Sequence, residues 1–288
     1  MAPRDLLAGA FDTHVHASPD VVPRRLDFLE AAALAEASGM AGLVFKDVSA
    51  CTIDRAHAAN MAYPGVTSYG GLVLDGPVGG LNPSAVETAL RRGAKVVWMP
   101  VVDARNMIER YETGGLRLPI PPRRSQADGL TVFDMSGGIL GEVKEIVRLI
   151  AESDAVLATG HLAARESIAL LRLARDMGVR RMLVTHPLSR MVAATLAEQT
   201  AMVEIGAMLE HCAGQSTSRL EGLPVSSVAK SIDAVGFEHC IIAGDLGQTF
   251  NPPFVEGLRS FLGELEHQGL PRGVLASMVQ SNPRRLLE

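Results

Sequence analysis

The sequence predicts an α/β protein with a parallel sheet, and two observations carry this prediction. Short apolar runs rich in Val, Ile, Leu and Met recur along the chain, and longer segments with helical spacing separate them. Strands that are apolar on both faces and are joined by crossover helices belong to parallel sheets. Eight such runs in 288 residues predict a (β/α)8 TIM barrel, with a doubly wound open sheet as the alternative.

Each predicted strand is short, rich in aliphatic residues and bounded by Gly, Pro or polar residues. In chain order the strands are 10–14, 41–45, 66–74, 95–99, 155–159, 182–185, 202–209 and 240–243. Amphipathic helices are expected at 26–38, 83–92, 140–151, 165–177, 191–200 and 225–234. Gly39, Gly93 and Gly178 stand where a helix commonly stops. A last helix is expected from residue 271 to Ser281-Asn-Pro.

The fourth and fifth predicted strands are farther apart than the others, and the excess forms a long loop at 101–138. This segment contains several Gly and Pro residues, and loops of this length in compact domains are usually functional lids or disordered. The sequence shows no internal repeat and no domain linker. We therefore expect a single domain over residues 1–288, with the long loop over the carboxyl-terminal face of the barrel.

The composition excludes several classes of protein. With 47% apolar and 20% charged residues, the chain is neither disordered nor fibrous. The net charge is −5 and the basic residues are scattered, which argues against a nucleic-acid partner. Three cysteines without a CxxC pair argue against a disulfide framework. Without a signal peptide or a run of about 20 apolar residues, we expect a cytoplasmic protein that acts on a small molecule; a homo-oligomer is left open.

Half of the eight histidines fall at the ends of predicted strands, where barrel enzymes carry their catalytic residues. His14 and His16 end the first strand, His161 the fifth and His186 the sixth, and Asp245 ends the eighth. Because residues i and i+2 of a strand share a face, the first two can bind one ion, and the next two can reach it from the opposite wall. Imidazoles with one carboxylate suit Zn²⁺, with Mn²⁺, Fe²⁺ or Co²⁺ as alternatives.

This ordered set resembles the amidohydrolase superfamily of metal-dependent hydrolases, which are (β/α)8 barrels. The resemblance extends over nearly the whole chain. It is closest to a bacterial branch without an assigned activity, in Asp12-Thr-His-Val-His-Ala-Ser-Pro-Asp, Val97-Trp-Met-Pro, Ala158-Thr-Gly-His and Gly244-Asp-Leu-Gly-Gln. It implies one or two divalent ions bound by His14, His16, His161 and His186, with Asp245 as ligand and proton shuttle.

Lys46 marks a departure from the superfamily pattern. Many two-metal members carry a carbamylated lysine at the end of strand 4, where this chain has Trp98-Met-Pro, whereas Lys46 ends the second predicted strand. We expect Lys46 either to bridge two metal ions as its carbamate or to bind an anionic substrate as an ammonium ion. The alternative is a lysine that packs its stem against the rim or pairs with Asp47.

Other polar residues near strand ends are candidates for binding substrate. Arg24 follows the first strand, and its guanidinium could hold a carboxylate or phosphate, although an exposed arginine at a helix start is the alternative. His211 ends the seventh strand, and Trp98 either forms a wall of the pocket or fills the rim. Asp103, Arg105 and Asn106 follow the fourth strand and are weaker candidates.

These features predict a metal-dependent hydrolase that uses a metal-activated water on a small anionic substrate. Asp245 is expected to take the proton of the water and pass it to the leaving group. The resemblance favours an amide or cyclic amide bond. A lactone or phosphoester hydrolase is the first alternative, and a metal-dependent decarboxylase or hydratase is the second. A barrel that binds a metal or ligand without catalysis is the alternative outside the enzymes.

Overall fold

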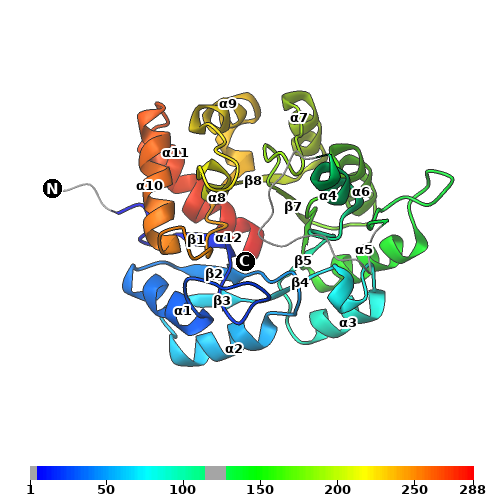
Figure 1. Cartoon of the computed structure of the whole chain (residues 1–288), viewed down its shortest axis with the longest axis horizontal. Coiled ribbons are helices and arrows are strands. Elements are labelled where there is room, and N and C mark those ends of the chain that lie inside the picture. Colours follow the sequence, from blue (N-terminus) through cyan, green and yellow to red (C-terminus); the bar gives the residue numbers. More distant parts are fainter. Residues whose placement is uncertain (1–4, 114–127) are drawn as a thin grey trace. The chain divides into compact units, whose positions relative to one another are not determined.

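A computed structural model describes residues 5–113 and 128–288 (Figure 1). The chain forms two compact units. The first unit comprises the chain up to Lys46, Thr52–Gly70 and His211–Glu288, and the second comprises Asp47–Cys51 and Gly71–Glu210. Both units are built of parallel strands with helices between them, so the predicted α/β class is confirmed. The expectation of a single domain over 1–288 stays a prediction.

The first unit is organised around β1, which contains His14 and ends just before His16. It pairs in parallel with β2, and β2 pairs with β3. On the other edge of β1, the N–H of His16 donates to the carbonyl of Leu246, which follows β9, at 3.2 Å. Helix α1 packs against both α2 and α10. The bounds are β1 (Phe11–Val15), α1 (Phe28–Ala37), β2 (Gly42–Phe45), α2 (Ile53–Ala62), β3 (Thr67–Tyr69), α8 (Ala213–Ser216), α9 (Val225–Val235), β9 (Cys240–Ala243) and α10 (Phe254–His267).

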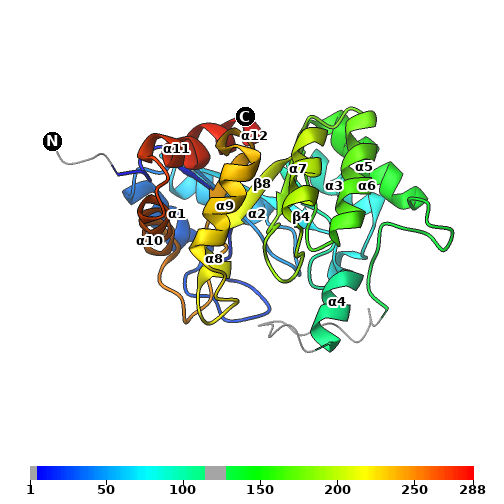
Figure 2. The same cartoon turned by 90° about the horizontal axis from the view of Figure 1, so that it is seen from above.

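The second unit consists of five parallel strands in chain order, β4 to β8. Nearly every strand residue is buried, which explains why these segments read as continuous apolar runs. Helices α3, α5, α6 and α7 pack successively against one another (Figure 2). The bounds are β4 (Gly71–Val73), α3 (Pro83–Arg91), β5 (Val96–Trp98), α4 (Arg105–Glu112), α5 (Gly141–Ser153), β6 (Val156–Ala158), α6 (Ala164–Asp176), β7 (Arg181–Thr185), α7 (Leu196–Ile205) and β8 (Met208–Cys212).

Two predicted strands have the wrong extent. The run 66–74 is divided into β3 and β4 at Gly70, where an added Cβ would collide with the backbone of Ile53. The run 202–209 begins too early, because its first four residues are the last turn of α7, which ends at Gly206 in the left-handed conformation. The helix predicted at 191–200 also begins later than expected. Helix α7 starts after Thr195, because Thr195 forms a capping box with Glu198.

The predicted long loop and the tail also contain more helix than expected. Helix α4 occupies the start of the 101–138 segment, and residues 114–127 of that segment lie outside the described residues. In the tail, helix continues through Asn282-Pro instead of ending there, as α11 (Arg272–Ala276), a π-helical turn (Ser277–Ser281) and α12 (Asn282–Leu287). Pro283 lies in the first turn of α12, directly after the π-helical turn.

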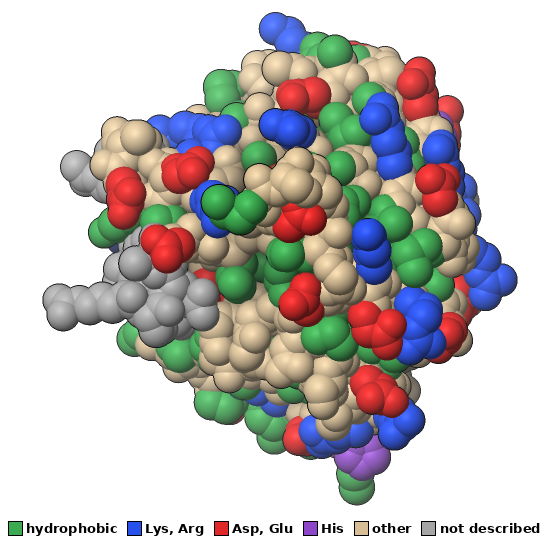
Figure 3. Space-filling view, turned by 90° about the vertical axis from the view of Figure 1, so that its right-hand side faces the viewer, with side chains coloured by type: hydrophobic (Ala, Val, Ile, Leu, Met, Phe, Trp, Pro, Cys, Tyr) green, Lys and Arg blue, Asp and Glu red, His purple; other side chains and the backbone are tan. Residues whose placement is uncertain are grey.

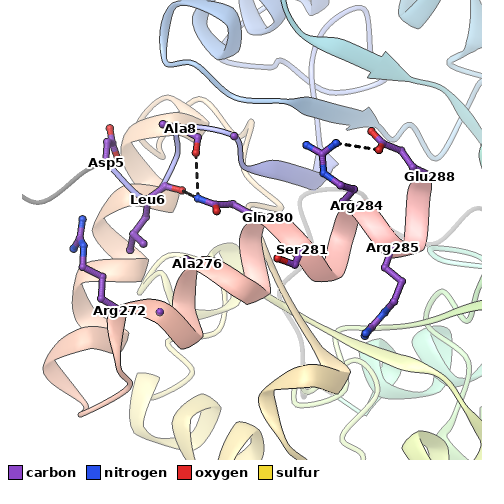
Figure 4. Close-up of a pocket in the computed structure, with 12 residues that line it drawn as sticks. Asp5, Leu6, Ala8, Arg272, Ala276, Gln280, Ser281, Arg284, Arg285 and Glu288 are labelled. Atoms are coloured by element: carbon purple, nitrogen blue, oxygen red, sulfur yellow. Dashed lines mark hydrogen bonds and ion pairs between the residues drawn. The ribbon is translucent and has the colours of Figure 1, made fainter.

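A hollow of about 1030 Å³ lies between this tail and the segment that leads into β1 (Figure 4). Gln280 joins its two sides, because its Nε2 donates to the carbonyls of Leu6 and Ala8 at 3.0 and 3.1 Å. Arg284 in its wall is paired with Glu288 at 3.0 Å. Arg284 in the wall of this hollow therefore already has an ion-pair partner within the protein.

The surface shown in Figure 3 carries Lys and Arg side chains interspersed with Asp and Glu, and the described side chains of this face form no patch of one sign. Within residues 5–113 and 128–288, no helix combines the length and the apolar character needed to cross a membrane.

A buried carboxylate organises the loop after β5. Asp75 accepts the backbone N–H groups of Val101 and Asp103 through Oδ1 at 2.8 and 3.2 Å, and that of Val102 through Oδ2 at 3.1 Å. Asp103 in turn accepts the N–H of Gly76 at 2.7 Å. Burial raises the pKa of Asp75 to about 6, and the nearby Asp103 carboxylate adds to this rise against the backbone hydrogen bonds. Asp103 therefore supports this loop, which accounts for its position without a substrate.

We expect the stability of the protein to depend on pH through Asp75. Because its pKa is higher in the folded than in the unfolded chain, its contribution to the free energy of unfolding is full below about pH 4 and declines as pH rises through about 6, by up to about 3 kcal/mol. Urea unfolding of wild type and Asp75→Asn between pH 4 and pH 7 measures this change as the difference between the two proteins. A pH-independent difference, equal to that for the exposed Asp233→Asn control, would contradict the assignment.

Candidate metal centre

Three side chains of the first unit converge at the ends of β1 and β9. The Oδ1 atom of Asp245 lies 3.1 Å from Nε2 of His16 and 3.4 Å from Nε2 of His14. The two imidazole rings are 5.3 Å apart, and all three residues are at most 9% exposed. The structure thus brings together three of the residues predicted as metal ligands.

Backbone hydrogen bonds fix this arrangement. The buried Asp12 carboxylate accepts the N–H groups of His14 at 3.0 Å and Gly244 at 2.8 Å, so it joins the ends of β1 and β9. The N–H of Asp245 donates to the carbonyl of His14 at 2.8 Å. A Cβ at Gly244 would collide with the Asp12 carboxylate, so the bridge requires glycine there. The geometry of the cluster therefore follows from the pairing of two strands.

Asp245 itself has a left-handed backbone, with φ of +48°. This conformation is uncommon for residues other than glycine, although Asp and Asn adopt it more readily than most. Residues with this backbone conformation persist only where the surrounding structure holds them, and they are often found at functional sites. At this turn the Asp245 carboxylate lies beside the two histidines.

Both histidines of the cluster are kept neutral. Burial lowers the pKa of His14 well below its usual value, and the positive charge of Lys46 lowers it further, against the opposing effect of Asp245. Burial likewise lowers the pKa of His16, with the Arg24 guanidinium as the next cause. Neutral imidazole is the form that binds metal ions, so these lowered pKa values favour metal binding at neutral pH.

The spacing between the Asp245 carboxylate and the two imidazoles fits a divalent ion. Bonds of about 2.0–2.2 Å to nitrogen and oxygen place neighbouring ligand atoms about 2.8–3.6 Å apart in octahedral or tetrahedral geometry. The observed separations of 3.1 and 3.4 Å from Asp245 to the two imidazoles match this range. With two neutral nitrogens and one carboxylate oxygen, the donor set suits a first-row ion such as Zn²⁺.

Two charged side chains that sequence reasoning considered lie beside this cluster. Lys46 directly follows β2 and is 2% exposed. Its backbone N–H donates to the carbonyl of Val15 at 2.9 Å. Arg24 has an almost fully buried side chain, and its Nη2 lies 3.4 Å from Nδ1 of His16. Its Nε donates to Asp20 at 2.7 Å. The alternative of an exposed arginine at a helix start is therefore wrong, because the guanidinium is enclosed beside a predicted ligand.

In the second unit, His161 and His186 form a buried pair with ring centroids 5.5 Å apart. The backbone of His161 is held on both sides: its N–H donates to the carbonyl of Pro100 at 2.9 Å, and its carbonyl accepts from Nδ2 of Asn106 at 3.0 Å. His186 has a left-handed backbone, with φ of +50°. Asn106, a weak candidate for a substrate contact, thus uses its amide to position the loop of His161.

His211 and Trp98 are not placed with the described cluster. Cys212 lies with its sulfur 3.9 Å from Nδ1 of His14, so the neighbouring His211 points to the opposite face of β8. There its Nε2 is 3.5 Å from the hydroxyl of Ser231 in α9, and burial lowers its pKa to about 4. Trp98 is fully buried in β5, and its ring occupies the space where Gly71 of β4 lacks a side chain. Both side chains pack in the interior.

Two residues of the cluster were missed by sequence reasoning. Gln215 in α8 donates from Nε2 to Oδ2 of Asp245 at 2.6 Å, and Asp12 bridges the two strands as described. Asp12 stands in the same short motif as the histidines, so its position was visible but its role was not. Gln215 carries no sequence signal, since it is an isolated glutamine 30 residues before Asp245.

Comparisons with known proteins place the chain in a wider context. The model of a family of unknown function (DUF6282) matches residues 9–210. Curated proteins give no match. Among solved structures, an amidohydrolase from Pseudomonas aeruginosa superposes with a TM-score of 0.63 at 13% identity, covering 98% of this chain and 96% of that one. A phosphotriesterase homology protein from Escherichia coli gives 0.61 at 14%, covering 98% and 99%.

A third structure, 2,6-dihydroxybenzoate decarboxylase from Rhizobium, gives a TM-score of 0.55 at 11% identity and covers 96% of this chain and 97% of that one. These similarities extend over almost the entire chain, so they show the fold, and the predicted (β/α)8 barrel is confirmed. The resemblance seen in the strand-end motifs agrees with them. The chain belongs to the family of unknown function DUF6282 and has the (β/α)8 fold of the amidohydrolase superfamily.

Proposed function

We propose that the protein is a metal-dependent hydrolase whose metal ion is bound by His14, His16 and Asp245. The observation that carries this proposal is the convergence of two neutral imidazole nitrogens and one carboxylate oxygen, all within 4.8 Å of one another. Zn²⁺ is the preferred ion, with Mn²⁺, Fe²⁺ and Co²⁺ as alternatives on the same donors. His161 and His186 are predicted as further ligands from the sequence.

The residues of the cluster have distinct roles in this proposal. A bound divalent ion supplies Lewis acidity toward the scissile bond and lowers the pKa of water. Asp245 accepts the proton of the attacking water and returns it to the leaving group, so one carboxylate does both base and acid work. The contacts with His14 and His16 keep the Asp245 carboxylate at the proposed metal site.

The proposed substrate is a small anion with an amide or cyclic amide bond. Arg24 supports the negative charge, because Asp20 orients its guanidinium from Nε, and its Nη2 lies beside His16. Lactones and phosphoesters are the next candidates, and a lactonase from Listeria monocytogenes and the phosphotriesterase homology protein are among the structures with this fold.

The similarity to a decarboxylase favours a second candidate function, decarboxylation. Mass analysis separates the two, since hydrolysis adds water and decarboxylation releases CO₂.

Asp245→Asn tests the catalytic role. We expect turnover to fall by roughly 10²–10⁴-fold, because an amide cannot accept the proton, while the fold is kept because Asn tolerates the left-handed backbone. Turnover on a panel of amides, lactones and phosphoesters, with metal content measured on the same sample, checks this. An unchanged rate would refute the role, and stoichiometric metal without turnover in the wild type would favour a binding barrel.

Arg24→Gln tests the anionic substrate. The amide keeps polarity but loses the charge, so KM for an anionic substrate is expected to rise by roughly 10-fold or more with a smaller change in kcat. A neutral analogue of the same substrate should show no such rise. Arg25→Gln is the matched control, since Arg25 is exposed and its Nη1 donates to the carbonyl of Thr249. An equal effect of both substitutions would remove Arg24 from substrate binding.

Lys46→Arg separates the two proposed states of the lysine. Arginine keeps the positive charge but does not form a carbamate, so it preserves anion binding and abolishes a carbamate bridge. If Lys46 is the bridge, we expect wild type to bind two metal ions per chain, to depend on bicarbonate, and to drop to one ion in Lys46→Arg. One ion in both proteins would exclude the bridge and leave the ammonium role.

A further inference from the structure

The two oxygens of the Asp245 carboxylate have different surroundings. Oδ1 faces Nε2 of His14 and His16, whereas Oδ2 accepts a hydrogen bond of 2.6 Å from Nε2 of Gln215. Gln215 is only 2% exposed, so this hydrogen bond is shielded from water. Oδ1 therefore faces the proposed metal site, whereas Oδ2 is engaged by a neutral donor.

The backbone around α8 places Gln215 against Asp245. Gln215 lies in α8, directly after β8, and the N–H of Gly214 donates to the carbonyl of Gly244 at 2.9 Å. The N–H of Leu223 donates to the carbonyl of Gln215 at 2.9 Å. A Cβ at Gly214 would collide with the carbonyl of Asp245, so glycine permits this close approach. The amide is thus fixed against the residue that it contacts.

An amide suits this position better than a charged donor would. It holds one oxygen of the carboxylate without neutralising it, so the negative charge remains available to a cation at Oδ1. Its orientation is defined, because turning Oε1 toward the carboxylate would set two acceptors against each other. Oε1 itself is buried and has no hydrogen-bond partner among the described residues, so no other group pulls the amide away from Asp245.

We infer that Gln215 is a positioning residue, which fixes the Asp245 carboxylate so that Oδ1 points into the metal site. This inference rests on the proposed metal-dependent function and adds a residue to it. Gln215 acts through Asp245 and contacts no reacting atom. The strained backbone of Asp245, with φ of +48°, increases the need for such support, because a side chain on a strained turn has alternative orientations once its partner is lost.

The test compares the affinity for Co²⁺ in wild type and Gln215→Met, measured by competition with a chelating dye. Methionine has a similar length but cannot donate a hydrogen bond. Loss of an outer partner of a metal ligand typically weakens metal binding by 10–100-fold, and we expect a change of about 10-fold here. Gln199→Met is the matched control, because Gln199 is fully buried in α7 and its Nε2 donates to the carbonyl of Ala194. It should leave Co²⁺ affinity unchanged.

A double substitution shows whether Gln215 acts through Asp245. In an Asp245→Ala background, Gln215→Met should change Co²⁺ affinity by less than about twofold, because the group that it positions is gone. An undiminished effect in that background would overturn the inference and indicate a general packing role. If Gln215→Met does not fold, Gln215→Asn replaces it, since the shorter amide cannot reach Oδ2 and should weaken binding similarly.

The outcomes separate this inference from the function on which it rests. If wild type binds no Co²⁺, the proposed metal-dependent function fails. If wild type binds Co²⁺ and Gln215→Met binds it equally well, only the positioning role of Gln215 fails. Turnover adds a second readout: kcat should fall in Gln215→Met with KM nearly unchanged, because substrate contacts are untouched.

Discussion

The carboxylate of Asp12 determines the geometry of the candidate site, because it holds the ends of β1 and β9 together. It accepts one N–H from each strand, at His14 and at Gly244. The residues that follow, His16 and Asp245, take their positions from this junction. A fully buried carboxylate is costly unless it is hydrogen-bonded, so the two backbone donors and the glycine that makes room for it form one unit.

Burial and the charges around this junction keep the imidazoles unprotonated, and Asp245 offsets the nearby positive charges. Lys46 and Arg24 lie near the imidazoles and disfavour their protonation, while Asp245 supplies the negative charge that a metal ion needs. Two further residues form hydrogen bonds with these charged groups: Gln215 donates to Asp245, and Asp20 accepts from Arg24. Asp245 and Arg24 therefore each have a partner that fixes the orientation of the side chain.

Much of the fold and part of the site could be predicted from the sequence. Buried parallel strands are continuous apolar runs, and the HxH spacing and Asp245 mark strand ends directly. The predicted helix boundaries were wrong where capping residues determine them, as at Thr195 and Gly206, which bound α7. Gln215 could not be predicted, because only the folded backbone brings it to Asp245. His211 was misleading because strand alternation, which depends on exact register, turns it toward Ser231 instead.

X-ray absorption of the Zn²⁺-loaded protein tests the central claim most directly, because it reports the atoms bound to the ion. The account predicts nitrogen and oxygen neighbours at about 2.0–2.2 Å with the outer-shell pattern of at least two imidazoles. It predicts one imidazole fewer in His14→Ala and in His16→Ala, and a count unchanged in His57→Ala, a histidine of α2. A zinc environment without imidazole, or one that neither His14→Ala nor His16→Ala alters, would contradict it.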